Sequence, residues 1–161
     1  MGAGWSRPKL TLAVTGAVVC TPRYRARVRW TVSAKGVVHD EHGVLLALNE
    51  RDEWELPGGQ LEEGETPEQC VAREILEETS LVVTAGCLLD AWVFEVIPGR
   101  QVLILAYACA LAVPDLARPR ASAEHAAVRF VGWGELDELT LPGGYRRAID
   151  IACSRQARGC A

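Results

Sequence analysis

The stretch that decides the fold runs from Gly58 to Leu81 and reads GGQLEEGETPEQCVAREILEETSL. Thr66 is suited to cap a helix, Pro67 fits the first helical position, and Gln69 completes a Thr-x-x-Gln capping box. The residues that follow keep the spacing of a helix with one apolar face. We therefore predict a helix over 67–79, with its direction and phase set by its first turn.

This predicted helix carries acidic side chains on one face and apolar side chains on the other. At about 100° per residue, Glu74, Glu77 and Glu78 fall within one arc of about 100°. Like charges at these spacings repel, and the helix dipole disfavours anions near the C-terminus. Each effect costs only about half a kcal/mol, but all of them oppose stability. The opposite stripe, predicted to face the core, comprises Val71, Ala72, Ile75, Leu76 and Thr79.

A bound divalent cation would remove this conflict. Clustered carboxylate oxygens suit a hard ion such as Mg²⁺ or Mn²⁺, which keeps several waters and bridges to substrate phosphates. None of the six cysteines forms a CxxC pair, and no His lies at zinc-finger spacing from any of them. The alternative is a solvated acidic helix face, which three acids alone would favour. The remainder of the segment decides between the two interpretations.

The segment resembles the signature of the Nudix hydrolase family. That signature is Gly, five residues, Glu, seven residues, Arg-Glu, an aliphatic, any residue, Glu-Glu, any residue, Gly and an aliphatic. The residues in register are Gly59, Glu65, Arg73, Glu74, Ile75, Glu77, Glu78 and Leu81. The six fixed matches alone would coincide by chance about once per ten million starts. One position departs: the final glycine is Ser80, at a helix end where a left-handed conformation is common.

The resemblance implies a Nudix fold, an α/β/α sandwich around a mixed β-sheet, in the α/β (α+β) class. The 161 residues contain no repeat or low-complexity linker and fit one domain. We assign residues 26–158 to the Nudix hydrolase domain and 1–25 to an N-terminal extension or extra strand. The apolar run Leu10 to Cys20 imitates a short leader but is too short to span a bilayer.

Apolar runs around the signature predict strands. Residues 31–39 and 44–48 flank the turn sequence Asp40-Glu41-His42-Gly43, so we expect them to pair as a hairpin. The WELPGG sequence predicts a short strand at 54–56 that ends at Pro57. Further strands are predicted at 88–96, 102–111 and 128–131, and a terminal helix at about 144–155.

The resemblance implies metal-dependent hydrolysis of a diphosphate linkage in a nucleoside diphosphate linked to another moiety. Nucleoside triphosphates, oxidised dNTPs, ADP-ribose and nucleotide sugars all contain such a linkage. Matching positions imply metal ligation by Glu74, Glu77 and Glu78, often with the carbonyl of Gly58 or Gly59. Glu74 or Glu78 is also a candidate to deprotonate the attacking water.

Further site residues are expected around these ligands. The resemblance implies that Arg73 pairs with Glu65 and orients the ligands. Nudix enzymes frequently use another acid from a loop, and Glu124 is the best candidate as ligand or base, with a plain loop acid as the alternative. Glu95 is a weaker candidate, and His125 is interpreted as a bystander.

Substrate-binding residues are less well marked. Aromatic residues on strands are usually part of a core, but some of these could stack on a base. Arginines near the predicted strand ends could hold a distal phosphate. The aromatic candidates are Trp54, Trp92, Phe94 and Tyr107, and the arginines are Arg51 and Arg100.

Composition restricts the partners. The net charge of −4 gives no support for nucleic-acid binding, and only the alternating arginines from Arg23 to Arg29 keep an RNA-decapping role open. A non-catalytic nucleotide or ADP-ribose sensor is the alternative function, but its usual sign, loss of the signature carboxylates, is absent. Cysteines in apolar surroundings indicate reduced thiols, so we expect a cytoplasmic protein that binds no membrane. Many family members dimerise, so a homodimer stays open.

Overall fold

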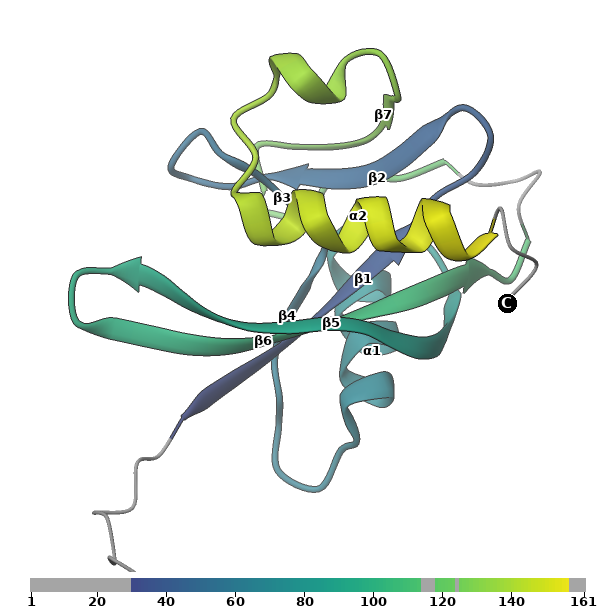
Figure 1. Ribbon diagram of the computed structural model, residues 1–161. Helices are drawn as coiled ribbons and strands as arrows, with labels where there is room; N and C mark the ends of the chain where they lie inside the picture. Colours follow the sequence, from purple (N-terminus) through teal and green to yellow (C-terminus); the bar gives the residue numbers. More distant parts are fainter. Residues whose placement is uncertain (1–29, 114–117, 124, 157–161) are drawn as a thin grey trace, which may run out of the picture.

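The computed structural model describes residues 30–113, 118–123 and 125–156, which form two β-sheets, two α-helices and a short 3-10 helix (Figure 1). The elements are β1 (Thr31–Val38), β2 (Gly43–Leu48), β3 (Trp54–Glu55), β4 (Gly58–Gln60), α1 (Pro67–Thr79), β5 (Val83–Ile97), β6 (Arg100–Leu111), β7 (Ala127–Gly132), η2 (Leu136–Glu138) and α2 (Gly143–Gln156). The larger sheet has the order β4-β1-β6-β5 and the smaller β3-β2-β7. Because β1 runs parallel to β6 and antiparallel to β4, the predicted mixed sheet is confirmed.

The two helices lie on opposite faces of the larger sheet. Helix α1 covers one face, and α2 lies on the other side, between the larger and the smaller sheet (Figure 1). Strand β1 is therefore buried on both faces, and its side chains alternate between them. Ala34 and Val38 pack in the cluster around α1, whereas Val37 joins the core between the sheets and α2. Lys35 lies on the same side of the strand as Val37, which directs a charged group toward the interior.

The predicted hairpin of residues 31–39 and 44–48 is wrong in its pairing. The turn itself forms, because the Asp40 carboxylate accepts hydrogen bonds from two backbone N–H groups of the turn. Beyond it, a single isolated bridge joins His39 to Val44, and β1 and β2 then enter different sheets. The turn sequence reports only local structure, whereas the pairing partners of β1 are β4 and β6. Because β1 is buried on both faces, its place in the larger sheet overrides the hairpin that the turn sequence predicted.

Helix α1 begins and ends at the predicted residues. The Thr66 hydroxyl accepts the N–H of Gln69 at 3.3 Å, and the Gln69 side chain accepts the N–H of Thr66 at 2.8 Å, which completes the capping box. At the other end Ser80 adopts φ 60° and ψ 17°, and its N–H donates to the carbonyl of Leu76. The chain thus keeps the left-handed helix end without the glycine.

The core-facing stripe of α1 is rotated relative to the prediction. Val71, Ile75 and Thr79 are fully buried as expected, but Leu76 is 48% exposed. Glu78 is only 5% exposed instead. Packing against the sheet therefore places the edge of the acidic face, and not Leu76, against the interior.

The other predicted strands and the terminal helix are present, but β4 (Gly58–Gln60) forms where the sequence predicted the end of a strand, and η2 (Leu136–Glu138) was not predicted. Strand β5 begins earlier than predicted, at Val83, and α2 covers the predicted terminal helix. Residues 1–25, assigned to an extension or extra strand, lie outside the described residues. No helix in the described part of the chain has the length and apolar character needed to cross a membrane.

Ser80 offers a test of the cost of its conformation. A Cβ in the left-handed region costs up to about 1 kcal/mol, so Ser80→Gly should raise the free energy of unfolding by about 0.5–1 kcal/mol. Ser80→Ala keeps the Cβ and should give no such gain. Urea denaturation of the three proteins measures the effect, and equal stability of the Gly and Ala variants would contradict it.

Candidate active site

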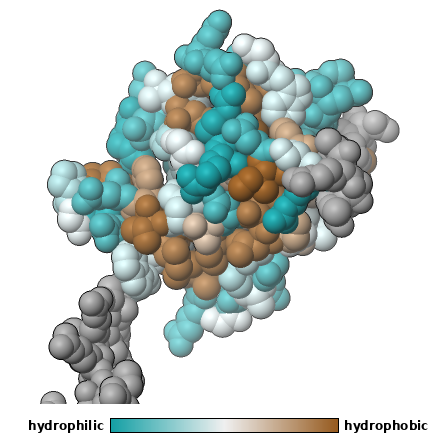
Figure 2. Space-filling model, viewed as in Figure 1, coloured by the Kyte–Doolittle hydropathy of each residue, from teal (hydrophilic) through white to brown (hydrophobic). Residues whose placement is uncertain are grey.

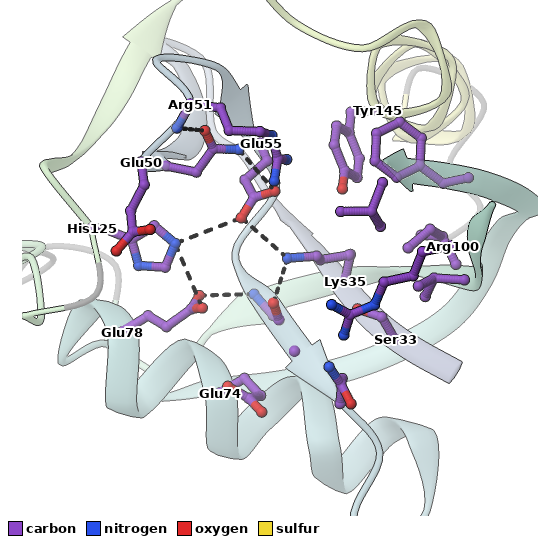
Figure 3. A pocket seen from close by; sticks show the side chains of 18 residues that line it. Ser33, Lys35, Glu50, Arg51, Glu55, Glu74, Glu78, Arg100, His125 and Tyr145 are labelled. Carbon is purple, nitrogen blue, oxygen red and sulfur yellow. Dashed lines mark hydrogen bonds and ion pairs between the residues drawn. The ribbon is translucent and has the colours of Figure 1, made fainter. Parts of the chain in front are cut away.

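A pocket of about 500 Å³ opens between the larger sheet, α1 and α2. Its walls come from β1, β3, β4, β5 and β6, the C-terminal half of α1, residues 49–51, His125 and the start of α2 (Figure 3). Glu74 and Glu78 of α1 line one side of the pocket, whereas on another side the ring centroid of Phe94 lies 6.0 Å from that of Tyr145 of α2. The pocket therefore joins a polar end to a largely apolar wall.

Glu78 reaches the polar end of the pocket beside Gly58 and the signature glycine Gly59. Its Oε2 accepts a hydrogen bond from the Gly58 N–H at 2.8 Å. Gly58 has φ 131°, and a Cβ on it would lie 2.2 Å from the carbonyl oxygen of Ala34. Only glycine fits both the backbone conformation and this close approach. The main chain of β4 thus meets Glu78 with no side chain between them.

Four side chains, together with the main-chain N–H and carbonyl of Gly58, form a closed ring of polar contacts. These contacts are drawn as dashed lines in Figure 3. The Lys35 ammonium donates to the Gly58 carbonyl oxygen and lies 3.6 Å from Glu55 Oε1. His125 Nε2 lies 3.7 Å from Glu55 Oε1 and 3.8 Å from Glu78 Oε1. The hydrogen bond from Gly58 to Glu78 closes the ring. We call these five residues the polar ring.

The polar ring separates the pKa values of its two carboxyl groups. Burial opposes ionisation of Glu55, but the His125 and Lys35 contacts outweigh it and lower the pKa of Glu55 to about 2. At Glu78 burial dominates and raises the pKa. The contact with Glu55 raises the pKa of His125. Glu55 is thus ionised at neutral pH, whereas ionising the buried Glu78 costs more free energy than ionising Glu55.

Arg73 gathers three carboxylates of the signature. Its guanidinium contacts both oxygens of Glu65, at 2.8 and 3.1 Å, so the expected pairing of Arg73 with Glu65 is present. The same group donates to Glu74 at 2.9 Å and to Glu77 at 3.1 Å. The hydrogen bonds from Arg73 lower the pKa of Glu65 to about 2.

Glu74 and Glu77 differ in where they point. Glu74 lines the pocket, and a Cβ on Gly59 would come within 2.4 Å of its Oε1. The Glu77 side chain is 59% exposed, turns toward Arg73 and does not line the pocket. The structure therefore brings Glu74 and Glu78 together with both glycines and leaves Glu77 at the rim.

The donors at this end of the pocket fit a hard divalent cation in type. Glu74 and Glu78 offer carboxylate oxygens, and Gly58 and Gly59 offer main-chain carbonyls, which are the ligands such ions prefer. The raised pKa of Glu78 shows a buried carboxylate whose negative charge a cation would stabilise. Among the described residues, however, no three Asp, Glu, His or Cys side chains converge closely enough to hold a metal ion. Glu77 would have to turn away from Arg73 to join such a site.

The two further candidate acids, Glu124 in a loop and Glu95 in a strand, and the histidine beside Glu124 have different outcomes. Glu124 lies outside the described residues. Glu95 is exposed at the β5–β6 turn, where its carboxylate accepts the N–H of Gly99 at 2.9 Å. His125, interpreted from the sequence as a bystander, instead lies buried in the polar ring.

One of the four aromatic candidates lines the pocket, and it is Phe94. The guanidinium carbon of Arg129 lies over the Trp54 ring, 5.2 Å from the ring centroid. Trp92 packs edge-on against Tyr145, and Tyr107 is buried in the cluster around α1. These three rings serve packing, as strand aromatics usually do.

Other cationic and aromatic side chains complete the lining. Arg51 and Arg100, the candidates for a distal phosphate, both lie in the pocket wall. Sequence analysis missed Lys35, Glu55 and Tyr145. Lys35 had a signal, since a lone charge inside an apolar strand is buried only when it is paired. The other two reach the pocket through tertiary packing, which no local pattern reports.

Comparison with known proteins agrees with this geometry. The model of the NUDIX domain matches residues 29–151. A MutT-like protein of Streptomyces ambofaciens is 39% identical over 110 residues, which is 67% of this chain and 68% of the relative. An 8-oxo-dGTP diphosphatase of Proteus vulgaris is 40% identical over 77 residues, 44% of this chain and 68% of the relative.

Solved structures share the fold. A NUDIX hydrolase from Nitrosomonas europaea superimposes with a TM-score of 0.68 at 19% identity, covering 78% of this chain and 90% of that chain. The domain match spans most of the chain and includes every signature residue in the pocket. The chain therefore belongs to the Nudix family.

Proposed function

We propose that the chain is a metal-dependent pyrophosphohydrolase that cleaves a diphosphate linkage in a nucleoside diphosphate joined to another group. One observation carries the proposal: a single pocket holds the carboxylates of Glu74 and Glu78, the cationic groups of Lys35 and Arg100, and the ring of Phe94. Phosphates suit the cations and a metal ion, and a nucleobase suits the aromatic wall.

The proposed chemistry assigns a role to each carboxylate. The ion, which we propose to be Mg²⁺ with Mn²⁺ as an alternative, neutralises charge on the phosphate oxygens when bound. We propose Glu74, Glu77 and Glu78 as its carboxylate ligands, with a carbonyl of the Gly58–Gly59 segment. Arg73 acts as a positioning residue, because it holds Glu74 against Glu65.

Hydrolysis requires a water molecule that loses a proton as it attacks. Glu74 or Glu78 accepts that proton, the water oxygen bonds to one phosphorus, and the bridging P–O bond breaks. The leaving phosphate keeps the electron pair of the broken bond. Glu124 remains proposed as a further ligand or base, and its chain neighbour His125, which lines the pocket, supports this.

A substrate panel tests the proposal. Nucleoside triphosphates, oxidised dNTPs, ADP-ribose and nucleotide sugars are each incubated with the protein and Mg²⁺ or EDTA. The relative named 8-oxo-dGTP diphosphatase makes the oxidised dNTP the first compound to assay. We expect Mg²⁺-dependent release of phosphate, pyrophosphate or a nucleoside monophosphate from at least one class. Tight binding without turnover would support the sensor alternative instead.

Glu74→Gln tests the carboxylate that lies closest to Gly59. The change keeps the shape of the side chain but removes its charge, so kcat should fall at least about a hundredfold. Glu63→Gln is the matched control, because Glu63 is an exposed acid of the same segment, and its activity should stay within about twofold of the parent. Equal activities of the two variants would contradict the role of Glu74.

Glu78→Gln tests the cost of the buried charge. Folding raises the pKa of Glu78 above its ordinary 4.5. The contribution of this carboxyl group to the free energy of unfolding is therefore complete below pH 4.5 and is lost as the pH rises through the folded-state pKa. Near pH 7.5 in EDTA the variant should melt above the parent, because its neutral amide carries no charge that folding must bury. Near pH 4 the two should melt together.

Thermal melts followed by circular dichroism measure both conditions. The same variant should hydrolyse substrate at least about a hundredfold more slowly with Mg²⁺ present. A variant that melts below the parent near neutral pH would show that the charged form of Glu78 stabilises the fold, contrary to this expectation.

A further inference from the structure

Lys35 is a charged member of the polar ring that stands at a buried strand position. It lies in the middle of β1, a strand buried on both faces, and is only 6% exposed. The register places it directly opposite Gly58 of β4. A strand position of this kind normally holds an apolar residue, so the ammonium is retained against its desolvation cost.

The ammonium uses its hydrogen bonds on groups of the candidate active site. It donates to the carbonyl oxygen of Gly58 and faces Glu55 Oε1 at 3.6 Å. Glu55 is ionised, and Glu78 lies across the ring, so the ammonium is a compact positive charge between two carboxylates (Figure 3). This arrangement resembles the surroundings of a bound cation more than those of a structural lysine.

We propose that Lys35 is a positioning residue that occupies the Gly58 carbonyl oxygen and competes with a divalent cation for it. The proposal rests on the proposed function, since it requires a metal ion in the same pocket. A second positive charge at this carbonyl is repelled by the ammonium. The protein without substrate should therefore bind a divalent cation weakly, and anionic phosphates that attract both charges should strengthen that binding.

Lys35→Met tests the competition, because methionine fills a similar volume in the strand without a charge. Isothermal titration with Mn²⁺ in the absence of substrate should show binding at least about tenfold tighter than in the parent. Arg100→Gln is the matched control: Arg100 is a cation of the same pocket on β6, and its loss should change the Mn²⁺ affinity by less than about threefold.

Each outcome of this titration has a meaning. Unchanged or weaker Mn²⁺ binding by Lys35→Met, in a protein whose parent binds the ion, overturns the competition and leaves the proposed function standing. An equal gain in Arg100→Gln also overturns it, because the effect would then be a general one of charge. A parent protein that neither binds Mn²⁺ nor hydrolyses any compound of the panel overturns both proposals.

A second measurement needs no variant. The ¹⁵N resonance of the Lys35 ammonium, protected from exchange by burial, is followed by NMR while Mg²⁺ is added to the parent protein. The competition predicts that this resonance shifts or broadens along the binding curve that a separate calorimetric titration gives for Mg²⁺. A resonance that stays unchanged at saturating Mg²⁺ shows that Lys35 and the ion do not share the carbonyl.

Discussion

The main-chain N–H and carbonyl of Gly58 form the contacts on which the pocket depends. Its N–H is bound by Glu78 of α1, and its carbonyl is bound by Lys35 of β1, so one residue connects the helix, the edge strand and the central strand. Both groups are buried, and the loss of either partner would be costly. Any side chain at this position would collide with the Ala34 carbonyl, so this residue, which directly precedes the signature glycine Gly59, must also be glycine.

Two cationic centres divide the acidic residues between them. Arg73 organises Glu65, Glu74 and Glu77 on the outer side of α1, whereas Lys35 holds the buried members of the polar ring together with the histidine. Carboxylates this close are tolerated because each borders a fixed positive group. At Glu78 the neighbouring positive groups do not fully offset the cost of burying the charge. A buried charge of this kind is typical of sites where function opposes stability.

The features that follow from local chemistry were predictable from the sequence. The capping box at Thr66 and the span of α1 depend on residues within a few positions of one another. The pairing of β1 was not predictable, because its partners lie far along the chain and the Asp40 turn signalled a hairpin. For the same reason Lys35 and Glu55 escaped notice: only the register of β1 with β4 brings the ammonium to Gly58.

The parallel pairing of β1 with β6 also orders events during synthesis. Thr31 pairs with Val102, so the central strand emerges from the ribosome about seventy residues before its neighbour exists. Loop-closure entropy must be overcome before this pair forms, and until then both faces of an apolar strand stay open to other chains. A nascent chain halted just after the signature would therefore carry α1 but neither β5 nor β6, and its exposed apolar strand would be a target for chaperones.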